Sequence, residues 1–399
     1  RLEKILEETF GVFVYQEQVL LCAREIAGFN LPAADLLRRA ITKARHETDY
    51  AGLRQRFLKG AVRCGLMREK ALEIFDLLRH FAGFGFCKAH AATYGYLAYQ
   101  SAWFKKHYPA LFMRAVLNNG GGYYPASVYI AEARRLGVTI VPPDVNCSGE
   151  LETLDDGRLY VGLGRIRDME AKTVEQILAG RPFGSFDDFL GRVRLSAVEA
   201  DNLVKIGGFD SIDPDRPRLL WRLRLAAQRG PVGQATGGNT TREPDDIFAG
   251  QLIVPTAKRL PQLPPVTPFE QFLYERDILG FSASRHPVTL FPAYDGVTVA
   301  AYANEPNGTA VRLCGWLADI KRIKTRETKE PMVFATFEDP EDTFEVVLFP
   351  GLLKEYSEMI REYRFFRIDG KINREGGTVA IIAEALSPAQ TGLDEAPYL

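Results

Sequence analysis

The stretch FAGFGFCKAHAATYGYLAYQSAWFKKHY, at residues 81–108, decides how the rest of the chain is organised. It opens with aromatic residues set between glycines, passes through Lys88 and His90, and continues with helical spacing. Glycine lets a backbone approach another group closely, and the first N–H groups of a helix favour an anion. The pattern indicates a phosphate-bearing ligand at the start of this helix. The alternative is a glycine-rich turn before a buried helix, with His90 in the core.

Length and composition indicate a globular protein of several domains. The chain has 399 residues, 46% hydrophobic and 25% charged, and a net charge of −1. That balance gives no overall signal for nucleic acid, so any such signal must come from local clustering. Basic residues do cluster in one early segment, although a solvated helix face explains the cluster almost as well. The cluster comprises Arg38, Arg39, Lys43, Arg45, Arg54, Arg56, Lys59, Arg63, Arg68 and Lys70.

The five cysteines form no CxxC pair, which argues against a zinc site and against a disulfide framework. We expect reduced thiols in a cytoplasmic protein. No apolar run approaches the length of a transmembrane helix. The chain opens with RLEKILEETFG, in the middle of an amphipathic pattern. We therefore expect it to be a fragment that lacks an N-terminal part.

Residues 1–115 have helical patterns throughout. Apolar spacing predicts helices over residues 16–27, 33–45, 49–64 and 68–82. Pro32 suits the first turn of the second of these helices. Arg38 and Arg39 are polar residues of that helix, and taken alone they indicate a solvated face.

Residues 151–226 contain two similar units with a glycine turn next to a helix, a pattern typical of helix–hairpin–helix motifs. Glycine amides in such turns can donate to a nucleic-acid phosphate without reading bases. In the second unit, Asp201 and Asp210 favour a purely structural copy. The first unit has basic neighbours, and its candidate DNA-binding residues are Gly162, Gly164, Arg165, Arg167 and Lys172.

Residues 228–266 have the Gly, Thr and Pro content of a flexible linker, interrupted by the apolar motif DDIF at 245–248. A helical connector at 267–296 follows. Alternating apolar residues then predict four or five strands with one helix at 352–361, which fits an OB-type barrel. Such barrels bind single strands through basic and aromatic side chains, although they also serve as protein adaptors. The candidate DNA-binding residues, on a segment expected to connect strands, are Lys321, Arg322, Lys324 and Arg326.

Three blocks resemble the C-family bacterial DNA polymerases, the group of the DNA polymerase III alpha subunit. They are FGVFVYQEQV at 10–19, ADLLRRAITKAR at 34–45 and FAGFGFCKAHAATYGYLAYQSAWFKKHYPALF at 81–112. The resemblance extends over essentially the whole chain and implies a multidomain α+β protein. Its parts would be a fingers domain (1–115), a tandem helix–hairpin–helix domain (116–227), a linker (228–266), a helical connector (267–296) and an OB-fold domain (297–390).

The resemblance also assigns roles to residues. It implies that the double arginine of ADLLRRA contacts the triphosphate of the incoming nucleotide, and that the glycine–aromatic stretch borders its base and sugar. The residues at these positions are Arg38, Arg39, Lys43, Phe84, Phe86, Lys88 and His90. The runs NNGGGYYPASVYIAEARRLGV and PRLLWRL are more similar to the error-prone branch, which works in DNA repair and translesion synthesis.

One part of the family pattern is absent. Members need paired palm carboxylates that hold two Mg²⁺ ions, and no Asp-x-Asp motif in a suitable place precedes the fingers here. We expect this chain alone to bind no Mg²⁺ and to be inactive. Its expected partners are primer-template and single-stranded DNA and deoxynucleoside triphosphates, with a sliding clamp or an accessory mutagenesis protein as further candidates. The alternative function is a non-catalytic DNA-binding or scaffolding subunit.

Overall fold

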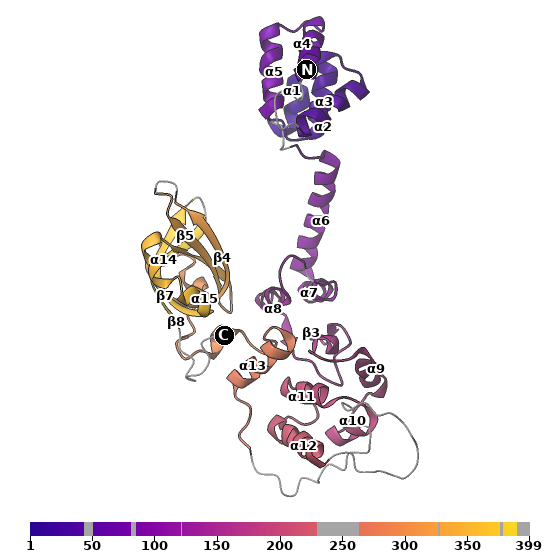
Figure 1. Cartoon of the computed structure of the whole chain (residues 1–399), viewed down its shortest axis with the longest axis vertical. Helices are drawn as coiled ribbons and strands as arrows, with labels where there is room; N and C mark the ends of the chain where they lie inside the picture. Colours follow the sequence, from indigo (N-terminus) through magenta and orange to yellow (C-terminus); the bar gives the residue numbers. More distant parts are fainter. Residues whose placement is uncertain are drawn as a thin grey trace. The chain divides into compact units, whose positions relative to one another are not determined.

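The computed structural model describes most of the chain, which divides into two compact units, Arg1–His107 and Tyr108–Leu399. The first unit ends earlier than the predicted helical region of residues 1–115. Figure 1 shows the helices and strands of both units. The described residues are 1–43, 51–80, 85–120, 122–229, 263–325, 328–375 and 378–388.

The first unit is helical, as its apolar spacing predicts. Its core contains fully buried Phe57 and Phe75, whose ring centroids lie 5.4 Å apart. The helices predicted over residues 16–27, 33–45, 49–64 and 68–82 are confirmed, with ends that differ by a few residues or lie outside the described ranges. The elements are α1 (Leu2–Leu6), η1 (Glu7–Thr9), α2 (Gln16–Ala27), α3 (Leu31–Lys43), α4 (Ala51–Arg63), α5 (Arg68–His80) and α6 (Lys88–His107).

Helices α2 and α4 approach closely at Gly60. A Cβ atom added at Gly60 would lie 2.1 Å from the carbonyl oxygen of Ala27. We predict that Gly60→Ala lowers the free energy of unfolding by about 1–3 kcal/mol, because backbone has to move to admit the methyl group. The gain in helix propensity, about 1 kcal/mol, offsets only part of this cost. Denaturant unfolding measures the change.

Gly95 of α6 supplies the matched control, because an added Cβ would meet nothing within 4 Å. Gly95→Ala should leave stability unchanged or raise it by up to about 1 kcal/mol. Equal effects of the two substitutions would contradict the close contact between α2 and α4.

Helix α6 begins at Lys88, as predicted, but it is not the buried core helix of the alternative interpretation. None of its residues is buried, and His90 is exposed. The His90 ring lies against Tyr94, with 4.4 Å between ring centroids. The expectation that His90 belongs to a core is therefore wrong.

The second unit begins with helices around a small sheet of strand order β1-β3-β2. Phe183, Phe186, Phe189 and Phe209 pack edge to face in its core. The predicted helix 197–205 is confirmed, whereas the first glycine turn follows strand β3 rather than a helix. The elements are α7 (Pro109–Asn118), α8 (Ala126–Arg135), β1 (Thr139–Val141), β2 (Thr153–Asp155), β3 (Arg158–Tyr160), η3 (Leu163–Arg165), α9 (Ala171–Gly180), α10 (Phe186–Arg192), α11 (Ala197–Lys205) and α12 (Arg216–Arg229).

A helical connector follows the segment 230–262, which lies outside the described residues. Its elements are α13 (Pro268–Leu279), η4 (Pro287–Leu290) and η5 (Val299–Tyr302). The fully buried carboxylate of Glu275 accepts hydrogen bonds from Ala283 N (2.7 Å) and Ser284 N (3.0 Å). These bonds fix the turn after α13, since a buried carboxylate needs such donors.

The C-terminal part is a closed barrel of strand order β4-β5-β6-β8-β7, which confirms the predicted OB-type fold. Strands β6 and β8 pair in parallel, and the other neighbours are antiparallel. The predicted helix 352–361 is two short helices. The barrel elements are β4 (Ala310–Lys324), β5 (Pro331–Glu338), β6 (Thr343–Leu348), α14 (Pro350–Tyr356), α15 (Met359–Glu362), β7 (Phe365–Glu375) and β8 (Thr378–Pro388).

Candidate nucleic-acid interface

Gln16 joins two of the predicted nucleotide-binding blocks in the first unit. Its side-chain Nε2 donates to the carbonyl oxygen of Gly85 (2.8 Å), and its Oε1 accepts from Arg38 Nη1 (2.6 Å). The backbone N of Gln16 also donates to the Phe86 carbonyl oxygen (2.8 Å), beside a parallel bridge between Tyr15 and Phe86. The arginine block and the glycine–aromatic block are therefore neighbours in space.

Asp35 holds the two arginines of α3. Its carboxylate pairs with Arg38 and Arg39 at 2.8 Å each. A hydrogen bond from Arg38, with the charges of both arginines, holds the pKa of Asp35 below its usual value. The Arg39 side chain is 64% exposed and that of Arg38 24%. Arg38 is thus fixed in direction, whereas most of the Arg39 side chain is exposed to solvent.

The first turn of α6 is already occupied by a carboxylate from the same unit. Glu17 accepts the backbone N–H of Lys88 at 2.9 and 3.1 Å, and the Lys88 side chain pairs with Glu8. Glu17 therefore takes the N–H group of Lys88, and the phosphate-bearing ligand expected at this helix start stays a prediction. Lys88 also lies 5.8 Å from the ring centroid of Tyr15.

Glu17 should make the docking of α6 sensitive to acid. Burial acts to raise the pKa of Glu17, but hydrogen bonds from Lys88 N and Cys87, with the charge of Arg38, bring it below 4.5. A depressed folded-state pKa means that the stabilisation is present above 4.5 and is lost as pH falls through the folded value. Glu17→Ala should cost about 1 kcal/mol at pH 7, the size of a helix-cap effect.

Urea unfolding of wild type and Glu17→Ala at pH 7 and pH 3 measures this difference, which should shrink in acid. Glu25→Ala is the control, because Glu25 forms an exposed ion pair with Arg24 that contributes little. A difference that stays constant with pH would contradict the role of the Glu17 carboxylate.

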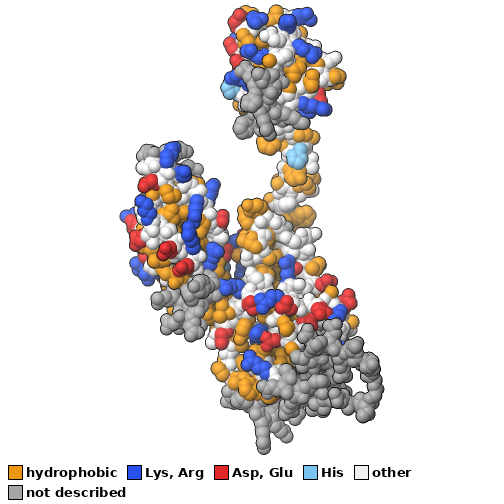
Figure 2. All heavy atoms as spheres, in the orientation of Figure 1, with side chains coloured by type: hydrophobic (Ala, Val, Ile, Leu, Met, Phe, Trp, Pro, Cys, Tyr) orange, Lys and Arg blue, Asp and Glu red, His pale blue; other side chains and the backbone are white. Residues whose placement is uncertain are grey.

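Three of the predicted site residues lie outside what the structure describes: Phe84, Arg326 and the side chain of Lys43. Phe86 is described and is 64% exposed. Figure 2 shows hydrophobic side chains over α6, and its exposed aromatic residues include Tyr94, Tyr96 and Tyr99. The nucleotide-binding roles of these residues stay predictions.

In the first helix–hairpin–helix unit, the glycine turn is engaged within the protein. Gly162 is buried, and the N–H of exposed Gly164 donates to the carbonyl oxygen of Glu150 (2.9 Å). Arg165 pairs with the buried carboxylate of Glu152 (2.7 Å) and donates to the Leu117 carbonyl oxygen (2.8 Å). These groups stabilise the turn, and their contact with DNA stays a prediction.

The remaining basic residues of this unit also have partners. Arg167 forms a two-pronged pair with Asp277 of α13 (2.7 and 2.9 Å), which raises the pKa of Arg167. Lys172 is 73% exposed and lies 2.8 Å from Glu170. In the second helix–hairpin–helix motif, Asp210 pairs with Arg216 across the turn. This pairing agrees with a purely structural role for that motif.

The barrel carries its candidate cations on a long hairpin. Lys321, Arg322 and Lys324 lie within β4, not on a segment that connects strands, because β4 stays paired with β5 as far as Lys324. All three are exposed, and none of their side chains has an ion pair or hydrogen bond to a described residue. Figure 2 shows Lys and Arg side chains along the barrel. Unpaired cations of this kind suit a phosphate backbone.

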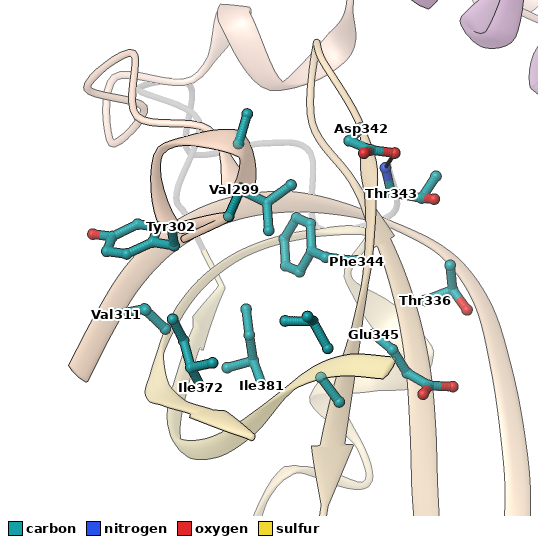
Figure 3. Close-up of a pocket in the computed structure, with 14 residues that line it drawn as sticks. Val299, Tyr302, Val311, Thr336, Asp342, Thr343, Phe344, Glu345, Ile372 and Ile381 are labelled. Atoms are coloured by element: carbon teal, nitrogen blue, oxygen red, sulfur yellow. Dashed lines mark hydrogen bonds between the residues drawn. The ribbon is translucent and has the colours of Figure 1, made fainter. Parts of the chain in front are cut away.

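One end of the barrel contains a pocket of about 390 Å³ with an apolar lining. In Figure 3, Phe344 lies among Val299 and Ile381, while the carboxylates of Asp342 and Glu345 lie toward the edge. The lining includes no Lys or Arg. This pocket therefore suits an apolar group rather than a phosphate, and it is chemically distinct from the hairpin of β4.

Three regions of the chain match known families. Residues 1–65 match the family described as the bacterial DNA polymerase III alpha subunit finger domain. Residues 137–219 match a helix-hairpin-helix motif, and residues 311–389 match an OB-fold nucleic acid binding domain. The order of these regions is the order that the resemblance predicts.

Whole-chain relatives agree with the regional matches. The DNA polymerase III subunit alpha of Borreliella burgdorferi is 30% identical over 96% of this chain and 34% of its own length. That of Thermus aquaticus is 34% identical over 90% of this chain and 30% of its own length. The error-prone DNA polymerase of Burkholderia mallei is 30% identical over 98% of this chain and 36% of its own length.

The chain belongs to the C-family of bacterial DNA polymerases. It spans about a third of the length of these relatives. The two kinds of C-family relative match it at similar identity.

The chemistry of C-family polymerases implies Mg²⁺, but the described residues do not form a binding site for this ion. In the described ranges, no group of three His, Cys, Asp or Glu side chains is placed to hold a metal ion. We therefore assign no metal-dependent step to them.

None of the described helices combines the length and apolar character needed to cross a membrane.

Sequence reasoning missed three residues of the contact network in the first unit: Gln16, Glu17 and Asp35. Gln16 and Glu17 stand inside the block at 10–19, and Asp35 is the residue before LLRR. Polar side chains at the start of a predicted helix were the available signal. Their partners Gly85 and Lys88 lie about seventy residues away in the sequence, which no local pattern reveals.

Proposed function

We propose that this chain binds DNA and the incoming nucleotide within a C-family DNA polymerase. The observation that carries the proposal is the hairpin of β4, where Lys321, Arg322 and Lys324 have no partner among the described residues. Cations without counter-charges gain most from phosphate contacts, because they have no protein ion pair to break. Their place on an OB-type barrel suits a single strand.

The incoming nucleotide would bind at the first unit. Arg38 is held by Asp35 and Gln16 beside the glycine–aromatic backbone, so its guanidinium is ordered before a ligand arrives. Arg39, with 64% of its side chain exposed, offers a second donor for the triphosphate. Phe86 and His90 are exposed nearby in sequence, and they would border the base and sugar.

Phosphoryl transfer would depend on a cluster of carboxylates, which the described ranges do not contain. We propose that a palm with paired aspartates and Mg²⁺ completes the site, and that the chain works in the error-prone branch. The runs at 118–138 and 217–223 support that branch. A sliding clamp or an accessory protein would bind the linker, whose DDIF motif lies outside the described residues.

The pure 399-residue chain should bind primer-template DNA at about 50 mM salt without extending it. Fluorescence anisotropy measures binding, and a gel assay with Mg²⁺ and all four nucleotides measures extension. Absence of binding to primer-template DNA would contradict the DNA-binding role. Extension by pure chain would contradict the proposal that the metal-holding carboxylates lie outside it.

A further inference from the structure

A second pocket in the second unit is lined by residues of α8, α13 and the barrel strands β4 and β5. Its volume is about 270 Å³. Its lining is unusually cationic, with Arg134 from α8, Arg276 from α13 and Arg364 just before β7. The carboxylate in the lining is that of Glu338, so the lining has an excess of positive charge.

The arginines of this pocket are poorly compensated. Arg276 and Arg364 have no ion pair or side-chain hydrogen bond with any residue in the described ranges. Asp277, the carboxylate next to Arg276 in sequence, is hydrogen-bonded by two guanidinium nitrogens of Arg167. The charge of Arg276 also helps to lower the pKa of Asp277. Arg134 donates to the carbonyl oxygen of Ser282 (2.7 Å). Its burial lowers its pKa, although Glu275 and Glu338 act in the other direction.

His286 supplies an unused donor on the same lining. Its side chain is 94% buried, since only 6% is exposed, and its Nδ1 accepts from the backbone N of Val288 (3.3 Å). The proton of the neutral ring must then sit on Nε2. That nitrogen is buried without a hydrogen-bond partner, and the nearby Glu338 Oε1 is 3.7 Å away. A buried N–H group favours a ligand that can accept from it.

Glu338 does not neutralise the site. Its carboxylate lies 3.8 Å from Arg135, a further arginine of α8 that also pairs with Glu132 (3.0 Å). Aromatic side chains of Phe272, Phe281 and Trp316 complete the lining. Such apolar walls exclude water and strengthen the attraction between arginine and an anion.

We propose that this pocket binds a phosphate group, held by Arg134, Arg276 and Arg364 and by the Nε2–H of His286. Phosphate matches the site because arginine donates to its oxygens in pairs. The group could belong to a free phosphate compound or to a DNA strand, and the chemistry of recognition is the same. The lining includes neither the three exposed cations of β4 nor the α3 arginines, so its test does not depend on theirs.

Trp316 reports on the pocket that it lines. In the full chain carrying Trp103→Phe and Trp221→Phe, titration with inorganic phosphate should change Trp316 fluorescence and saturate. Arg276→Ala and Arg364→Ala should each weaken this binding by about tenfold or more, the effect of losing a charged hydrogen bond. Arg361→Ala is the matched control, an exposed arginine of α15 outside the lining, and should leave binding unchanged.

His286→Asn separates the phosphate contact from the fold. The asparagine oxygen can still accept from Val288 N, as Nδ1 does now, while the Nε2–H is lost. We expect weaker phosphate binding and an unchanged circular dichroism spectrum.

A 5′-phosphorylated oligonucleotide and its unphosphorylated counterpart then distinguish the two sources of phosphate. Lack of saturable binding by either inorganic phosphate or the phosphorylated strand, or binding unaffected by both arginine changes, would overturn the proposal.

Discussion

Replacing Lys321, Arg322 and Lys324 together with glutamine is expected to weaken binding to single-stranded DNA by roughly 100-fold at low salt. Each cation that contacts a phosphate releases a bound counterion, and this release is the main source of affinity in sequence-independent binding. None of the three has an ion pair in the described part of the chain, so their whole charge is available to the strand. Fluorescence anisotropy with a labelled oligonucleotide measures the loss.

Lys371→Gln is the matched control for this experiment. Lys371 is also on the barrel, but its Nζ lies 2.5 Å from the carboxylate of Glu384. Removing a cation that is already balanced should change affinity much less. Binding by the triple variant at the wild-type level would show that the hairpin of β4 is not the DNA-binding surface.

Arg38→Ala is expected to lower kcat/KM for nucleotide incorporation by about 10- to 100-fold, the effect of losing a charged hydrogen bond to phosphate. The measurement uses a polymerase that carries these residues together with its metal-holding part. Arg38 is held by both Asp35 and Gln16, so Arg38→Lys should not restore activity. A lysine cannot make the same forked set of contacts.

Arg24→Ala controls for general effects, because Arg24 forms an exposed pair with Glu25 on α2. Thermal unfolding of each variant checks that the first unit remains folded. Wild-type incorporation kinetics in folded Arg38→Ala would contradict the proposed contact with the triphosphate.

The fold was largely predictable where local signals suffice. Helix 197–205 is marked by Ser196 and Glu199, which form a capping box in the structure. The helix at 16–27 ends at Gly28, whose φ of +66° suits glycine. Strand β4 extends beyond the stretch in which apolar and polar residues alternate. The bulge after Leu317 shifts which side chains face inward and so interrupts the alternation.

The candidate site was less predictable, because its contacts are long-range. Arg165 has the sequence context of a DNA contact, yet its guanidinium pairs with buried Glu152. The only signal for Gln16 was its polar side chain at the start of a predicted helix, and its contact with Gly85 depends on the pairing of Tyr15 with Phe86. Exposure of α6 also could not be inferred, since its apolar content is typical of a buried helix.

The salt dependence of single-stranded DNA binding tests the central claim most directly. Three phosphate contacts by the β4 hairpin predict that log affinity falls with log salt at a slope of about −2 or steeper. The triple glutamine variant should have a slope shallower by about 2. A wild-type slope near zero would contradict the assignment of this barrel as a DNA-binding surface. The same slope in the wild type and the triple glutamine variant would also contradict it.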